Sequence, residues 1–185
     1  MAHAMAPSGQ VCRTSFSRQR PVIFVTVGTD GPFDRLVRTI DLWAAETRRT
    51  DVFAQIGKSA LRPGFIQYTD FLEPPEFLER FAAARLVISH AGMGTILMAL
   101  RYTKPLLVFP RRAALGEQRN DHQLATAMRL SAMGKIEVAF DESELIGRLM
   151  NIEGVAARAT TGPYAQPELI SAIRAFIHGE GSSGP

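Results

Sequence analysis

A run of β-branched and aromatic residues at positions 21–27 (PVIFVTV) ends at Gly28, and this run limits the choice of fold more than any other segment. A strand buried on both faces of a parallel sheet reads as a continuous apolar run, whereas a half-exposed strand alternates. Gly28 permits a tight turn out of the strand. The run therefore predicts a buried strand in a sheet that helices flank.

Strand-like and helix-like segments alternate along the rest of the chain. Short apolar runs predict five more strands, at residues 51–56, 64–68, 86–89, 105–110 and 136–140. Apolar residues at helical spacing predict helices at residues 33–49, 75–84, 95–102, 120–133, 142–150 and 168–177. This order predicts an α/β fold, a Rossmann-like parallel sheet flanked by helices. Such sheets bind ligands beyond the C-terminal ends of their strands, so we expect functional residues in the loops there.

Composition excludes several classes of protein. The chain has 185 residues, 46% hydrophobic and 21% charged, unlike a disordered, coiled-coil or collagen-like chain. Its longest apolar stretches, residues 21–27 and 106–110, are far shorter than the ~20 residues of a membrane-spanning helix. The single cysteine, Cys12, excludes an intrachain disulfide and a cysteine-based metal site, and it fits a reducing compartment.

The net charge of +3 comes from the first 20 residues, where Arg13, Arg18 and Arg20 have no acidic counterpart. The remaining residues carry 18 basic and 18 acidic side chains, which removes the main argument for nucleic-acid binding. We expect residues 1–20 to be a disordered basic extension, with an organellar transit peptide as the alternative. Residues 21–178 are expected to form one domain and residues 179–185 a flexible tail.

The loop at residues 28–32 (GTDGP) follows the first predicted strand. Its two glycines, Gly28 and Gly31, allow backbone N–H groups to approach an anion at the start of the next helix. Gly28 and Thr29 are therefore candidate diphosphate-binding residues. The alternative is a plain strand-to-helix turn in which Asp30 caps the helix.

The loop at residues 90–95 (HAGMGT) follows the fourth predicted strand. Gly92 and Gly94 leave amides free to wrap a diphosphate, Thr95 adds a hydroxyl, and His90 can add a hydrogen bond or a positive charge. Leu97 occupies the third glycine position of a dinucleotide fingerprint, and no P-loop Gly-Lys-Ser/Thr is present, so neither motif fits. The alternative is a structural histidine at a strand end.

A polar segment, residues 111–123, follows the fifth predicted strand. Its last four residues can hydrogen-bond several hydroxyl groups, as sugar recognition requires: Asn120, Asp121, His122 and Gln123. Asp121 can alternatively cap the helix. The arginines form either a solvated face or a site for a carboxylate: Arg111, Arg112 and Arg119.

Metal and hydrolase sites are not expected. The histidines lack the spacing of ligand pairs: His3, His90, His122 and His178. A Gly-x-Ser-x-Gly nucleophile elbow is also missing from the sequence. We therefore expect no metal and no cofactor.

Four segments in this order resemble the C-terminal, donor-binding domain of glycosyltransferase family 28: FVTVGTDGPFDRL, LVISHAGMGTILMAL, KPLLVFPRR and RNDHQLATAMRL. The resemblance covers residues 22–140. It is strongest to free-standing versions of this domain, found in bacterial exopolysaccharide glucuronosyltransferases and in the dolichol-pathway N-acetylglucosaminyltransferase. The segments 33–36 (FDRL) and 116–123 (GEQRNDHQ) resemble the exopolysaccharide group most.

The resemblance implies roles for individual residues. The donor diphosphate would be held by Gly92, Met93, Gly94 and Thr95, with Gly28 and Thr29 lining the same cleft, and His90 is the candidate catalytic residue. The donor sugar would contact Asp121, His122 and Gln123. Their own chemistry adds Asn120 and, for a carboxylated sugar, Arg112 as candidates. Met98 stands where N-acetylglucosaminyl members have a ribose-binding Glu, which favours the exopolysaccharide branch.

The family fold, GT-B, has two Rossmann-like halves, and this chain has room for one. The resemblance implies an inverting UDP-sugar glycosyltransferase subunit without metal, held at the cytoplasmic face of the membrane by a membrane-associated acceptor-binding subunit and acting on a lipid-linked saccharide. We expect UDP-glucuronate as donor, for exopolysaccharide assembly. The alternatives are a UDP-GlcNAc-dependent N-acetylglucosaminyltransferase subunit and a non-catalytic nucleotide-binding module.

Overall fold

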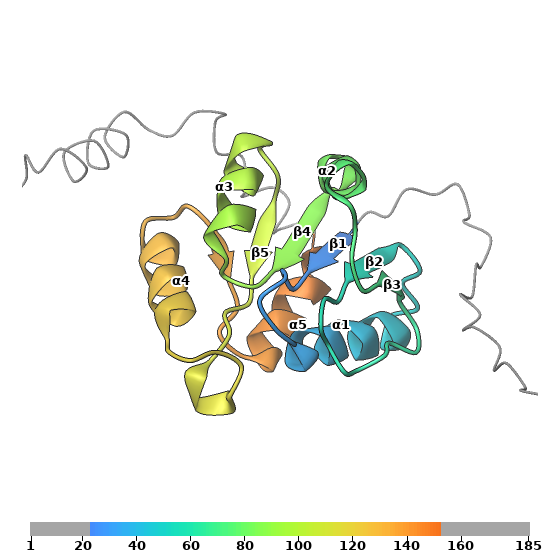
Figure 1. Cartoon of the computed structure of the whole chain (residues 1–185), viewed down its shortest axis with the longest axis horizontal. Helices are drawn as coiled ribbons and strands as arrows, with labels where there is room; N and C mark the ends of the chain where they lie inside the picture. Colours follow the sequence, from blue (N-terminus) through green and yellow to red (C-terminus); the bar gives the residue numbers. More distant parts are fainter. Residues whose placement is uncertain (1–22, 153–185) are drawn as a thin grey trace, which may run out of the picture.

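The structure, a computed structural model, describes residues 23–152, and six parallel strands in this part form one sheet (Figure 1). The strands are β1 (Ile23–Thr26), β2 (Val52–Gln55), β3 (Gln67–Thr69), β4 (Leu86–Ser89), β5 (Leu106–Val108) and β6 (Glu137–Val138). Their order across the sheet is β3-β2-β1-β4-β5-β6, with every neighbouring pair parallel. The predicted fold class is confirmed.

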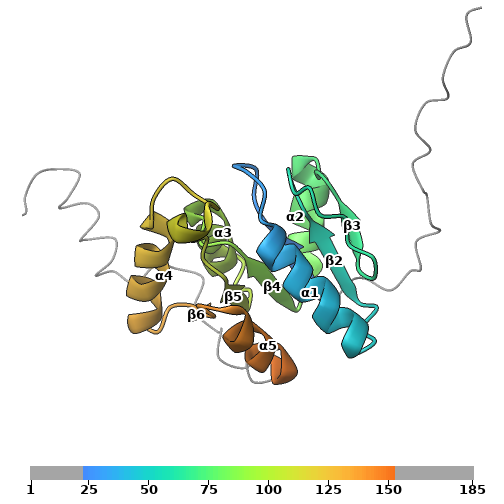
Figure 2. The same cartoon turned by 90° about the horizontal axis from the view of Figure 1, so that it is seen from below.

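Helices cover both faces of this sheet. They are α1 (Asp34–Glu46), α2 (Pro74–Ala83), α3 (Met93–Arg101), α4 (His122–Ala132) and α5 (Glu142–Met150), with a 3₁₀ turn, η1 (Ala113–Leu115), before α4. Helices α1 and α5 lie on one face, and α2, α3 and α4 lie on the other (Figures 1 and 2). None of the helices in residues 23–152 has the length and hydropathy needed to cross a bilayer.

Side chains of β1 alternate between the two faces, and both faces are buried. Ile23 and Val25 join the core cluster under α1 and α5. Phe24 joins the cluster under α2, α3 and α4, where the ring of Phe81 lies 6.4 Å from its own. A strand packed on both sides needs apolar side chains at successive positions, which explains the continuous run in the sequence.

The chain reverses its direction across the sheet between β1 and β4. Strands β2 and β3 extend the sheet on one side of β1, and β4, β5 and β6 extend it on the other. The loops after β1 and β4 therefore leave neighbouring strands at the C-terminal edge of the sheet. Open α/β sheets bind ligands at such a switch point.

The third strand begins later than predicted. Residues 64–66, expected to lie in this strand, instead donate three backbone N–H groups to the Asp41 carboxylate on α1, each at 2.9 Å. β3 starts only at Gln67. The Asp41 carboxylate, 23–25 residues away in sequence, thus takes the place of a neighbouring strand as the hydrogen-bond acceptor for residues 64–66.

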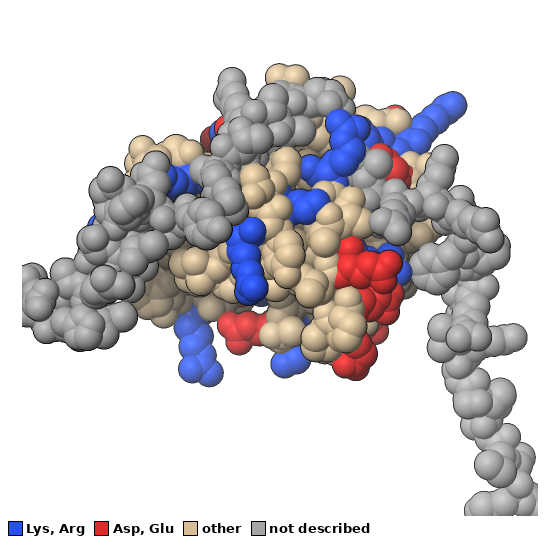
Figure 3. Space-filling view, turned by 90° about the horizontal axis from the view of Figure 1, so that it is seen from above, with Lys and Arg blue, Asp and Glu red and all other residues tan. Residues whose placement is uncertain are grey.

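Charged side chains of both signs are spread over the α2 and α3 side of the molecule (Figure 3). Lysine and arginine side chains lie among uncharged surface, and a group of acidic side chains gathers at one side of this view. The predicted helix at residues 168–177, the basic extension at 1–20 and the tail at 179–185 lie outside the described residues.

Candidate functional site

The imidazole of His90 lies between two glycines at the switch point. A Cβ built on Gly28 would come within 2.6 Å of His90 Cε1, and one built on Gly92 would overlap His90 Nε2. Gly28 also has a φ of +73°, a conformation that side chains disfavour. Both glycines are therefore required where the loop after β1 meets the loop after β4.

Gly94 faces open space instead. A Cβ at this position would meet no atom of residues 23–152 within 4 Å. Gly94 lies in the first turn of α3, whose N-cap residue Gly92 supplies no side-chain cap. Within residues 23–152, the N–H groups of Met93, Gly94 and Thr95 have no protein acceptor, as at any uncapped helix start. This helix terminus can bind an anion.

The loop after β1 offers further N–H donors. Those of Thr29, Asp30 and Gly31 have no acceptor in the described part of the chain. Asp30 does not cap α1, whose N-cap residue is Phe33; its carboxylate instead accepts from Gln118 Nε2 at 3.4 Å. The predicted capping by Asp30 is therefore wrong, and diphosphate binding by this loop stays a prediction.

The surroundings of His90 favour its neutral form. Burial, and next the positive charge of Arg111, lower the pKa of His90 to about 4; the Thr26 backbone and the Asp30 carboxylate offset part of this effect. The buried Nδ1 has no hydrogen-bond partner of acceptable geometry in residues 23–152. At pH 7 the unliganded protein thus holds a neutral imidazole, which can donate a hydrogen bond but supplies no positive charge.

Arg111 is buried, with 1% of its surface exposed, although the sequence predicts it on a solvated face or in a carboxylate site. Its Nη2 donates to the carbonyls of Val27 and Gly31, at 3.0 and 2.9 Å. Its Nη1 donates to those of Pro32 and Glu117, at 2.5 and 3.3 Å. The guanidinium thus joins the loops after β1 and β5, and the expectation that Arg111 is solvated is wrong.

Beside Arg111, Arg35 on α1 pairs with Glu117 in the loop after β5. Arg35 Nε lies 2.7 Å from one Glu117 oxygen and Nη2 lies 2.9 Å from the other. The Arg35 guanidinium also lies 4.1 Å from the ring centre of Phe109. The segments 33–36 and 116–123, which resemble the exopolysaccharide group, therefore contact each other inside the domain.

Gln123 links the loops after β4 and β5. Its Oε1 accepts from Ala91 N at 3.2 Å and from Arg111 N at 3.3 Å. This amide oxygen is therefore occupied, and only Nε2 is left to contact a ligand. The structure thus brings Gln123 next to the two glycine loops.

The other predicted sugar-binding residues lie before or at the start of α4. Asp121 is the N-cap residue, but its side chain does not cap α4. Its carboxylate accepts from Ala113 N at 2.9 Å instead, so the predicted capping by Asp121 is wrong. Asn120 Oδ1 accepts from His122 N at 3.3 Å, and His122 is exposed. Their contacts with a sugar stay predictions.

Arg112 and Met98 make contacts within the domain. Arg112 Nη2 donates to the Phe140 carbonyl at 2.5 Å, and its Nε is buried without a partner in residues 23–152. Met98 packs against the core cluster under α2, α3 and α4. The Arg112 guanidinium is thus bonded within the domain, and the Met98 side chain offers no carboxylate to a ribose hydroxyl.

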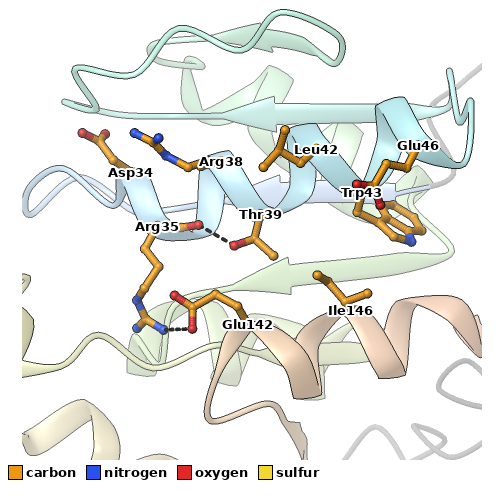
Figure 4. A pocket seen from close by; sticks show the side chains of 9 residues that line it. All are labelled: Asp34, Arg35, Arg38, Thr39, Leu42, Trp43, Glu46, Glu142 and Ile146. Carbon is orange, nitrogen blue, oxygen red and sulfur yellow. Dashed lines mark hydrogen bonds and ion pairs between the residues drawn. The ribbon is translucent and has the colours of Figure 1, made fainter.

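A separate groove of about 550 Å³ lies between α1 and α5 (Figure 4). Its lining residues are Asp34, Arg35, Arg38, Thr39, Leu42, Trp43, Glu46, Glu142 and Ile146. None of them belongs to the glycine loops, and the groove lies on a helix-covered face. We therefore place the candidate site at the switch point, where the unpaired N–H groups lie. The described residues include no cluster of three or more side chains suited to a metal.

The roles of Arg111, Arg35 and Glu117 are absent from the sequence prediction. One signal was available: Leu107 and Phe109 face the cluster under α1 and α5, and Arg111, two residues on, continues that face. The Arg35–Glu117 pair has no such signal, because 82 residues separate its members.

Comparison with known proteins supports the resemblance. The model of the glycosyltransferase family 28 C-terminal domain matches residues 22–157. The UDP-N-acetylglucosamine transferase subunit ALG13 of Eremothecium gossypii is 44% identical over 68 residues, which are 36% of this chain. This match spans about a third (32%) of that relative.

Solved structures share the fold. MurG of Acinetobacter baumannii has a TM-score of 0.57 at 20% identity, over 88% of this chain and 51% of MurG. A solution structure of ALG13 has a TM-score of 0.52 at 21% identity, over 74% of this chain and 87% of that one. The match to about half of MurG agrees with one half of a GT-B fold. Because the family model covers most of the chain, this protein belongs to the family of glycosyltransferase family 28 C-terminal domains.

Proposed function

We propose that this chain is the donor-binding subunit of a UDP-GlcNAc-dependent N-acetylglucosaminyltransferase. The observation that carries the proposal is the uncapped start of α3 beside the loop after β1, at the switch point of the sheet. The named relative, a UDP-N-acetylglucosamine transferase subunit, supports the choice of donor.

The diphosphate of the donor would lie against N–H groups of two loops that have no acceptor within the described part of the chain. Met93, Gly94 and Thr95 offer donors from α3, and Thr29 and Gly31 offer donors from the loop after β1. The open space at Gly94 allows a close approach to the backbone. The neutral His90 adds a hydrogen-bond donor, so the site would bind the diphosphate through fixed dipoles.

The reaction would be an inverting displacement at the anomeric carbon. An acceptor hydroxyl, losing its proton to a base, forms the new C–O bond while the bond to UDP breaks and its electron pair leaves with the diphosphate. Fixed N–H groups stabilise the charge that develops on this leaving group. The base, the membrane-associated acceptor-binding subunit and the lipid-linked saccharide would come from outside this chain, at the cytoplasmic face of the membrane.

Contacts of Arg35, Glu117 and Arg112 within the domain argue against UDP-glucuronate as the donor. The segments that resemble the exopolysaccharide group hold the domain together through Arg35 and Glu117. Arg112, the candidate partner for a sugar carboxylate, donates to the Phe140 carbonyl. UDP-GlcNAc is therefore the donor that we favour.

Calorimetric titration of the full chain tests this proposal. We expect UDP and UDP-GlcNAc to bind, and UDP-glucuronate and ADP to bind more weakly. Tighter binding of UDP-glucuronate than of UDP-GlcNAc would overturn the donor assignment. Failure of every uridine nucleotide to bind would overturn the donor-binding function itself.

A further inference from the structure

We infer that Arg111 is a positioning residue of the donor site, which turns the carbonyl groups of the loop after β1 away from the bound diphosphate. This inference rests on the proposed function. Arg111 would not touch the donor; it would act through the backbone of the loop that does.

Three carbonyl oxygens of this one loop converge on the Arg111 guanidinium. They belong to Val27, Gly31 and Pro32, at 3.0, 2.9 and 2.5 Å from its Nη atoms. Carbonyl oxygens carry partial negative charge and would repel a diphosphate if they faced it. All three are bonded to the buried guanidinium of Arg111, while the N–H groups of Thr29, Asp30 and Gly31 keep no protein acceptor in residues 23–152.

The same residue reaches the other two loops of the site. Its backbone N–H donates to Gln123 Oε1, which also accepts from Ala91 in the loop after β4. Its Nη1 also donates to the Glu117 carbonyl in its own loop. Arg111 is thus the point where the loops after β1, β4 and β5 are joined.

The guanidinium brings a positive charge under the loop as well as N–H donors for its carbonyl groups. Burying a guanidinium carries a desolvation cost, which its hydrogen bonds to the carbonyl groups offset here. Here the guanidinium lies 4.7 Å from the ring centre of Phe33, against which an apolar side chain could also pack. A cation under the loop is, however, useful at an anion site, because its field acts at short range in a dry interior.

The test compares Arg111→Met and Arg111→Lys with the matched control Arg148→Lys in the full chain. Arg148 pairs with Glu137 on β6 and also has a buried Nε without a partner in the described residues. Affinities for UDP and uridine are measured by NMR titration well below each melting temperature. The ratio of the two affinities isolates the diphosphate contribution.

We expect Arg111→Met to weaken UDP binding about tenfold or more while uridine binding changes less than about twofold. Arg111→Lys keeps the charge but loses the planar guanidinium, so its affinity for UDP should lie between those of Arg111→Met and the wild type. Arg148→Lys should bind UDP as the wild type does. If Arg111→Met fails to fold, the same criteria apply to Arg111→Lys.

Two outcomes would overturn the inference. Folded Arg111 variants could bind UDP with wild-type affinity, or they could lose UDP and uridine affinity equally. In contrast, failure of the wild-type protein to bind UDP would contradict the proposed function instead, so the two failures can be distinguished.

Discussion

Arg35 and Glu117 form a two-point ion pair between α1 and the loop after β5, with N–O distances of 2.7 and 2.9 Å. Both side chains are about nine-tenths buried, at 12% and 11% exposure. Glu117 also accepts from the Arg112 N–H at 2.9 Å, so one carboxylate fixes the start of its own loop as well. The pair thus holds the polar segment after β5 against the first helix.

Replacing Glu117 with glutamine should destabilise the domain by about 3 kcal/mol, because it leaves the buried Arg35 guanidinium with only the more exposed carboxylate of Glu142, at 3.7 Å. Urea unfolding followed by the fluorescence of Trp43, the only tryptophan, measures this change. Asp70→Asn is the control, since it breaks the Arg62 pair, whose side chains are more than half exposed, and should change stability by less than about 1 kcal/mol. Equal effects of the two variants would contradict the role given to Glu117.

Alanine at Gly92 and at Gly94 should have different effects. Gly92→Ala pushes a methyl group into the His90 ring and should destabilise the domain by about 1–3 kcal/mol. Gly94→Ala adds a methyl group in open space on a helix and should leave stability unchanged or slightly raised. Thermal melts of both variants test this contrast.

Gly94→Ala should nevertheless weaken UDP binding by about tenfold, because its methyl group stands where the diphosphate approaches the backbone. Calorimetry with UDP measures the loss. A stable Gly94→Ala variant with wild-type UDP affinity would exclude the start of α3 as the diphosphate site.

His90 should make stability depend on pH. Its pKa is about 4 in the folded protein against about 6.5 when unfolded, so between these values the unfolded chain binds more protons. The free energy of unfolding should therefore be highest above pH 6.5 and fall towards pH 4, by up to about 3 kcal/mol from this group. The difference in the free energy of unfolding between wild type and His90→Asn, measured from pH 4 to pH 6.5, isolates the effect of this group. NMR titration gives the pKa of His90 directly. If the stability of the two proteins depends on pH in the same way, the predicted contribution of His90 is wrong.

Arg112→Ala should not change the preference between UDP-GlcNAc and UDP-glucuronate, because its guanidinium donates to the Phe140 carbonyl. The ratio of the two dissociation constants, measured by calorimetry for variant and wild type, tests this. A selective loss of UDP-glucuronate affinity would restore Arg112 as a carboxylate-binding residue.

Local sequence patterns are enough to predict an element when its own residues determine how it is buried. β1 is an example, because packing on both faces demands apolar side chains throughout. The start of β3 could not be predicted, because the Asp41 carboxylate takes the N–H groups of residues 64–66. Tertiary contacts of this kind override local propensity.

The same distinction applies to the candidate site. The glycine loops were recognisable because each follows an apolar run. That Gly28 and Gly92 both pack on the His90 ring depends on β1 and β4 being neighbours, which the topology decides. The burial of Arg111 was missed because arginine is rarely buried, and only its hydrogen bonds to carbonyl groups make it tolerable here.

Gln123 holds two loops through a single amide oxygen, which fixes the orientation of the amide and leaves its NH2 group on the opposite side. A glutamate at this position would keep an acceptor for both loops while presenting a second acceptor in place of that donor. The hydrogen-bonding polarity beside the glycine loops can therefore change by one substitution without moving the backbone. In evolutionary terms, loop architecture and ligand preference at this position can diverge independently.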